Sequence, residues 1–108
     1  MRINNTDLTQ LIESCFDLSM DVRIKDVNTR GDFLAFGKRL RGSLLNLLTA
    51  QFANDTQAVI DANKQLKVVN QDLVKIKQDL QNIVQVIGQL GNLVSILDDL
   101  LKIASTFV

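Results

Sequence analysis

Few residues of this 108-residue chain have the types that enzymes use for catalysis. The sequence contains no histidine, so the commonest general base and metal ligand is missing. Cys15 is the single cysteine, and it lies among the apolar positions of a predicted helix, where a packed thiol is favoured over a nucleophile. Glu13 is the only glutamate, and Asp98 and Asp99 are adjacent on a helix and point apart. The sequence therefore predicts a protein that is not an enzyme and that uses no metal, cofactor or small-molecule substrate.

A cluster of basic residues in the first half of the chain is the main candidate for a binding site. It consists of Arg30, Lys38, Arg39 and Arg41. Basic clusters of this kind bind phosphate groups or acidic partners. The whole chain is neutral, however, with 12 basic and 12 acidic residues, which argues against nucleic acid as the partner. We therefore favour a solvated helix face over an anion-binding patch at these residues.

An apolar repeat with alternating steps of three and four residues dominates the second half of the chain. This spacing is the 3.5-residue period of a helix whose seam is covered by other helices. The outermost positions of the repeat are polar, as a solvent-exposed face requires. The repeat predicts the following interface residues: Leu66, Val69, Leu73, Ile76, Leu80, Ile83, Ile87, Leu90, Val94, Leu97 and Leu101.

The elements implied by these patterns are all helical, and they form one domain over residues 1–108. A short helix is expected at about 6–20 and a loop at about 21–31, with turn residues at 28–31. A long helix is expected over about 32–105, with Asp32 as its N-terminal cap. The apolar repeat stays in phase across Gly88 and Gly91, which favours an unbroken helix there. A break near 54–56 is left open, because Asn54 could end one helix and cap the next.

A helix of about 70 residues would span roughly 100 Å, whereas a compact chain of this length has a radius of gyration of only about 13 Å. Such a helix needs other chains to cover its apolar seam. After residue 80 the apolar face also widens, because Val86, Leu93 and Leu100 flank the seam. The sequence therefore predicts a helical bundle or coiled-coil oligomer, formed with copies of itself or with a helical protein partner. A compact bundle of one chain, broken at 54–56, is the alternative.

The function that this architecture predicts is a non-enzymatic module for helical oligomerisation or protein–protein interaction. One alternative is binding to a membrane surface through residues 80–108, although that segment has few basic residues. A lesser alternative is nucleic-acid binding through the basic cluster. Residues 1–7 lack the apolar core of a secretory signal, so the expected location is cytoplasmic.

Overall fold

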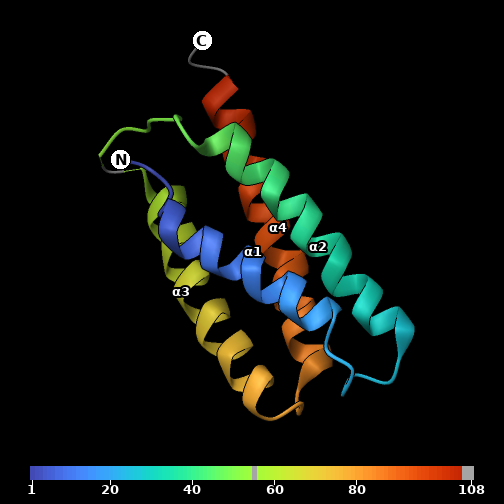
Figure 1. The fold of residues 1–108 in the computed structure, drawn as a ribbon. Helices are drawn as coiled ribbons and strands as arrows, with labels where there is room; N and C mark the ends of the chain where they lie inside the picture. Colours follow the sequence, from blue (N-terminus) through green and yellow to red (C-terminus); the bar gives the residue numbers. More distant parts are fainter. Residues whose placement is uncertain (55, 106–108) are drawn as a thin grey trace.

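The computed structural model consists of four α-helices, and it describes residues 1–54 and 56–105. They are α1 (Asn5–Ser19), α2 (Val27–Leu47), α3 (Gln57–Gln78) and α4 (Ile83–Ser105). α1 and α3 run in one direction and α2 and α4 in the other (Figure 1). α1 packs against α2 and α3, and α4 packs against the same two helices, so the four form a bundle measuring 45 × 20 × 19 Å. The predicted all-α fold class is confirmed.

The two N-terminal helices begin where side chains cap them. The Asn4 side chain accepts a hydrogen bond from the Asp7 backbone N–H, so α1 begins close to the predicted position. The Asp26 side chain accepts from the Asn28 N–H at 2.9 Å, and α2 therefore begins at Val27. The connection between α1 and α2 is non-helical over 20–26, so the predicted loop over 21–31 extends too far. The predicted cap at Asp32 is wrong, because the cap at Asp26 places residues 27–31 in the first turns of α2.

The predicted continuous helix over 32–105 is also wrong, because the chain is interrupted twice. The first interruption spans residues 48–56 and includes the region where a break was left open; residue 55 lies outside the described part of the chain. Phe52 is buried there, and its backbone N–H donates to the Met1 carbonyl at 2.8 Å. This connection carries the chain from α2 to α3, which lie diagonally across the bundle with no pair of Cα atoms within 8 Å among the described residues (Figure 1).

The second interruption, at residues 79–82, was not predicted. Asp79 leaves the helix with extended backbone angles (φ −143°, ψ 115°), and Asn82 adopts the left-handed region at φ 63°. Asparagine tolerates that region better than most residues. The apolar repeat continues with the same steps of three and four residues on both sides of this turn. Phase alone therefore does not distinguish a continuous helix from two helices of similar length that fold back on each other.

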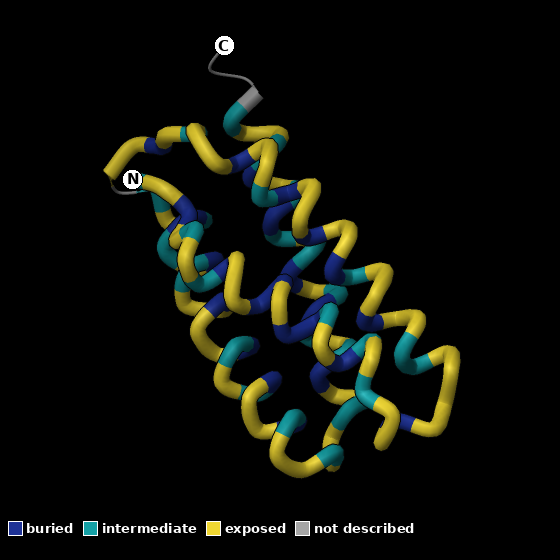
Figure 2. The backbone as a smooth tube through the Cα atoms, viewed as in Figure 1, coloured by how far each residue is buried: buried dark blue, intermediate teal, exposed yellow. Residues whose placement is uncertain are grey.

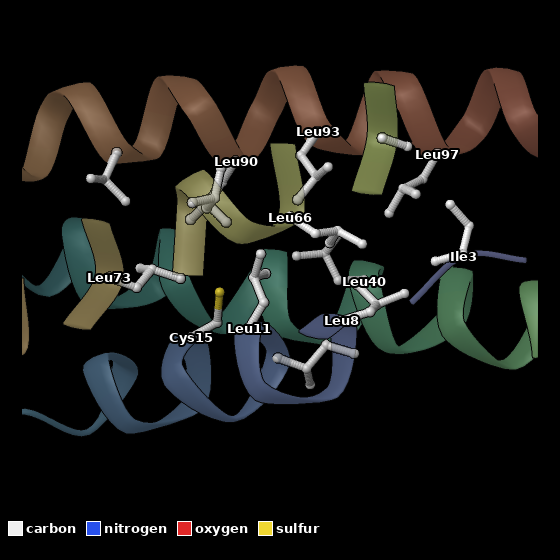
Figure 3. Close-up of a cluster of buried hydrophobic side chains, with 14 of the residues drawn as sticks. Ile3, Leu8, Leu11, Cys15, Leu40, Leu66, Leu73, Leu90, Leu93 and Leu97 are labelled. Atoms are coloured by element: carbon white, nitrogen blue, oxygen red, sulfur yellow. The ribbon is translucent and has the colours of Figure 1, made fainter. Parts of the chain in front are cut away.

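The apolar faces of all four helices meet inside the bundle, and Figure 2 shows the buried residues concentrated on the inward sides. A close-up of this core shows side chains from every helix pointing toward one another (Figure 3). Its labelled members are Ile3, Leu8, Leu11, Cys15, Leu40, Leu66, Leu73, Leu90, Leu93 and Leu97. Because the chain covers much of its own seam, the argument that other chains must cover a 100 Å helix no longer holds.

Candidate functional site

The one thiol of the chain is part of the core. Cys15 is 0% exposed, and its sulfur points into the core, with Leu11 of α1 and Leu73 of α3 drawn on either side of it (Figure 3). Burial raises the pKa of the Cys15 thiol to about 12, because a thiolate would lose its hydration there. A nucleophilic cysteine requires the opposite shift and access to solvent. The thiol is therefore a packing group in this fold.

Carboxylates are dispersed through the described residues, which contain no group of three or more Asp, Glu or Cys side chains placed to hold a metal ion. Asp98 pairs with Arg39 of α2 at 2.7 Å, whereas Asp99 lies 3.8 Å from Lys102 on its own helix. Two adjacent carboxylates thus point to different neighbours, as their spacing predicts.

Two surface hollows lie between helices, and neither gathers a catalytic set of side chains. One has a volume of about 150 Å³ beside the turn between α3 and α4, and it is lined by Asp72, Lys75, Ile76, Gln81, Asn82, Gln85 and Val86. The other, of about 420 Å³, is a shallow depression between α1 and α3, lined by Gln10, Asn70, Gln71, Val74 and Lys75.

The predicted basic cluster is divided between two sides of α2. Arg39 faces α4, where its guanidinium donates to Asp98 at 2.7 Å. Lys38 and Arg41 are exposed on the other side, and the Arg41 guanidinium lies 5.9 Å from the centre of the Phe16 ring on α1. Arg30 is half-buried on the same side of α2 as Arg41. The structure therefore keeps Arg30, Lys38 and Arg41 on one face and separates Arg39 from them.

The predicted interface residues also divide into two groups. One group lies in the core of this chain: Leu66, Val69, Leu73, Ile76, Leu90 and Leu97. The other group is half-buried at the edge of the core: Leu80, Ile83, Ile87, Val94 and Leu101. Only the second group retains surface that a partner could cover without opening the bundle.

Some core residues were not among the predicted interface residues. Val86, Leu93 and Leu100 of α4 are buried, and they occupy the flanking positions whose apolar character widens the face after residue 80. The apolar character of these flanking positions was the signal in the sequence that could have identified them as core residues. The exposed apolar side chains on the outer surfaces of α2 and α4 had no such signal, because exposure depends on where the neighbouring helices lie.

Comparisons with known proteins give no relative. No protein-family model matches the chain, and no curated protein or solved structure is significantly similar to it.

The residues Ile83–Ala104 of α4 are long and apolar enough to cross a membrane, judged by length and composition only. Core helices of bundles have the same composition, and α4 contributes five fully or nearly buried side chains to this core: Val86, Leu90, Leu93, Leu97 and Leu100. At the same time, only 28% of the most apolar stretch of α4 is buried. The helix therefore keeps apolar surface outside the bundle.

Proposed function

We propose that the protein is a non-enzymatic helical interaction module whose α4 binds a second copy of this chain. The proposed contact surface, which we name the α4 uncharged face, consists of Val84, Ile87, Gly88, Gly91, Val94 and Ser95. With 3.6 residues per turn, these positions cover about a third of the helix circumference. The face lies beside the stripe of α4 that packs into the bundle.

The observation that carries this proposal is apolar, uncharged surface left open to solvent. Val84 is 85% exposed, and Ile87 and Val94 are half-buried. The segment from Leu80 to Leu97 contains no charged residue. In a contact with twofold symmetry, the same surface of both copies forms the interface. An uncharged surface can pack against its own copy without repulsion between like charges.

Gly88 and Gly91 support the same proposal, because they permit a second helix to approach closely. A Cβ atom added at either glycine would meet no atom within 4 Å, so packing inside this chain does not require glycine there. Each glycine nevertheless lowers helix stability by about 1 kcal/mol relative to alanine. Small residues on a helix surface allow the backbones of two helices to come together, which gives these glycines a use that the single chain does not.

The test is the mass of the protein in solution, measured by light scattering over a range of concentrations. The wild type is expected to be dimeric. The double variant Gly88→Glu/Gly91→Glu is expected to be monomeric, because it places carboxylates where the two copies meet. Both substitutions enter open space and replace glycine with a better helix former, so the fold itself should become more stable.

The matched control is Gly31→Glu/Gly42→Glu on α2. Both of those glycines are exposed and also have no atom within 4 Å of an added Cβ. This control makes the same chemical change and should keep the dimeric mass. A wild type that stays monomeric at its highest soluble concentration would overturn the proposal. Equal masses for the two double variants would also contradict it.

The other two functions expected from the sequence have less support. Membrane binding through residues 80–108 would need α4 to withdraw Leu90, Leu93 and Leu97 from the bundle core; residues 106–108 lie outside the described part of the chain. Nucleic-acid binding through the basic cluster has less support because the four residues do not share one face: Arg39 is directed toward Asp98 of α4, away from Lys38 and Arg41.

A further inference from the structure

The outer face of α2 carries a second open surface, whose chemistry differs from that of α4. It is formed by residues at successive steps of three or four, and we name it the α2 basic stripe: Val27, Arg30, Leu34, Lys38, Arg41, Leu45 and Leu48. This spacing places all seven within a narrow sector of the helix. The outward side of α2 is largely exposed along its length (Figure 2).

Apolar side chains of the stripe protrude into solvent. The exposed fractions are 69% for Val27 and Leu45, 46% for Leu48 and 39% for Leu34. The connection between α1 and α2 adds Met20 and Val22 beyond the Val27 end, with exposed fractions of 70% and 75%. Isolated exposed apolar residues are ordinary, but a row of them along one helix face indicates a surface that something covers.

The charged residues interleaved with this row are all basic. Arg30, Lys38 and Arg41 form no ion pair with any carboxylate of residues 1–54 and 56–105. The buried Nε atom of Arg30 also lacks a hydrogen-bond partner among those residues. The Arg41 guanidinium rests on the Phe16 ring, which holds it at the surface while its charge remains open. Although the chain is neutral as a whole, this face presents unpaired positive charge.

Charge complementarity decides what can cover the stripe. A second copy docked here by twofold symmetry would bring Lys38 and Arg41 against the same basic residues, so self-association belongs on α4 and not on α2. Nucleic acid would pair with the basic side chains but would leave the aliphatic ones without a contact, because single strands are bound by aromatic stacking as well as by charge. The stripe needs a partner that is anionic and that also accepts aliphatic side chains over the whole length of a helix.

From these observations we infer that the α2 basic stripe docks the bundle onto an anionic membrane surface. A bilayer that contains acidic lipids offers both parts of the required chemistry along one plane. Lys38, Arg41 and Arg30 lie at the level of the headgroup phosphates, and the valine and leucine side chains enter the boundary of the acyl chains. The bundle stays folded in this contact, since none of its large core side chains has to move. This surface is separate from the α4 uncharged face, so the two proposals stand or fall independently.

The experiment is co-sedimentation of the full chain with vesicles. We expect binding to vesicles of phosphatidylcholine with about a third phosphatidylglycerol, and binding at least about tenfold weaker to phosphatidylcholine alone. Added salt should weaken the binding to the acidic vesicles, because counterions screen the basic side chains.

Substitutions on α2 and α3 test which surface of the bundle contacts the vesicles. Lys38→Glu/Arg41→Glu should weaken binding to the acidic vesicles at least about tenfold. Leu34→Ser/Leu45→Ser should weaken it at constant charge. The matched controls lie on α3: Lys64→Glu/Lys67→Glu reverses two exposed basic residues, and Val68→Ser/Val74→Ser removes two exposed apolar ones. The α3 variants should bind like the wild type apart from the small uniform effect of net charge.

Far-UV circular dichroism checks that each variant is folded, which is expected because all the substituted side chains are exposed. The proposal is overturned if the wild type does not bind acidic vesicles at low salt. It is equally overturned if the α3 variants lose as much binding as the α2 variants. Retention on single-stranded DNA or on an acidic peptide without vesicle binding would assign the stripe to a different kind of partner and would also refute the inference.

Discussion

α3 and α4 carry the same seven-residue apolar repeat, yet they bury different faces of it. α3 buries the predicted positions: Leu66, Val69, Leu73 and Ile76. α4 keeps two predicted positions in the core and adds three flanking ones, giving the set Val86, Leu90, Leu93, Leu97 and Leu100. Its remaining predicted positions, such as Ile87 and Val94, are only half-buried at the edge.

The difference follows from the width of the apolar face. In α3 the flanking positions are polar, as at Asp72, so only one stripe can be buried. In α4 the flanking positions are apolar, and the helix can be turned about its axis with little loss of buried surface. Its contacts with α2 and α3 then decide which stripe faces inward. A wide face also leaves surplus apolar surface, which in α4 is the surface proposed to bind a second copy.

The largest expected effect tests the narrow face of α3. Leu73 is fully buried, whereas the adjacent Val74 is 51% exposed. Leu73→Ala should lower the free energy of unfolding by about 2–5 kcal/mol, because it removes buried methyl groups and leaves a cavity. Val74→Ala should change it by no more than about 0.5 kcal/mol. Urea unfolding followed by circular dichroism measures both, and similar values for the two variants would contradict the assigned face of α3.

The next effect tests the rotated face of α4. Leu100 is fully buried at a flanking position, and Leu101 is half-buried at a predicted position. Leu100→Ala should destabilise the protein by about 3 kcal/mol and Leu101→Ala by about 1 kcal/mol, since the loss follows the surface removed from water. The same urea titration applies. If Leu101→Ala were the more damaging, α4 would bury the same face of the repeat as α3.

A smaller effect tests the turn that separates the two helices. Asn82 has φ 63°, so Asn82→Ala should lower the free energy of unfolding by about 1–2 kcal/mol. In a continuous helix the same substitution would raise it by about 0.5 kcal/mol, because alanine is the better helix former. Asn92→Ala, at an exposed position inside α4, is the control and should raise stability. Thermal unfolding of both variants decides the matter, and a gain at position 82 would argue against the turn.

The smallest effect concerns the C-terminal end of α3, which is bound by charged groups of the connection between α1 and α2. Arg23 donates to the Lys77 carbonyl at 2.6 Å and to the Asp21 carboxylate, and this hydrogen bonding lowers the pKa of Asp21 from 3.8 to about 2. The stabilisation from ionised Asp21 is therefore complete above its unfolded pKa and is lost as the pH falls through about 2.

Asp21→Asn should accordingly be slightly less stable than the wild type at pH 6, and the difference should shrink as the pH falls from 4 toward 2. Thermal unfolding across this range measures it. Asp79→Asn, which changes an exposed carboxylate that forms no ion pair with the described residues, is the control for the substitution itself. A constant difference between wild type and Asp21→Asn would show that Arg23 does not rely on the charge of Asp21.

Prediction from the sequence was least successful where it concerned which side chains are exposed. The basic residues Lys38 and Arg41 were identified, but the exposed apolar residues on the same face of α2, such as Leu34 and Leu45, were not. Val27 was placed in the predicted loop, whereas it is the first residue of α2. The apolar repeat of α3 and α4 was predicted to be an interface, but six of the predicted interface residues lie in the core of the same chain: Leu66, Val69, Leu73, Ile76, Leu90 and Leu97.

The sequence by itself determined the helical class, the approximate bounds of α1, the apolar side of α3 and the absence of histidine chemistry. These follow from residue type and from local periodicity, which act within a few turns of helix. The tertiary structure alone decided that the chain reverses at 79–82, which stripe of α4 is buried and which apolar side chains stay open. A repeat with a period of 3.5 residues indicates that one face of a helix must be buried. The same repeat is found whether that face packs against another chain or against a neighbouring helix of the same chain.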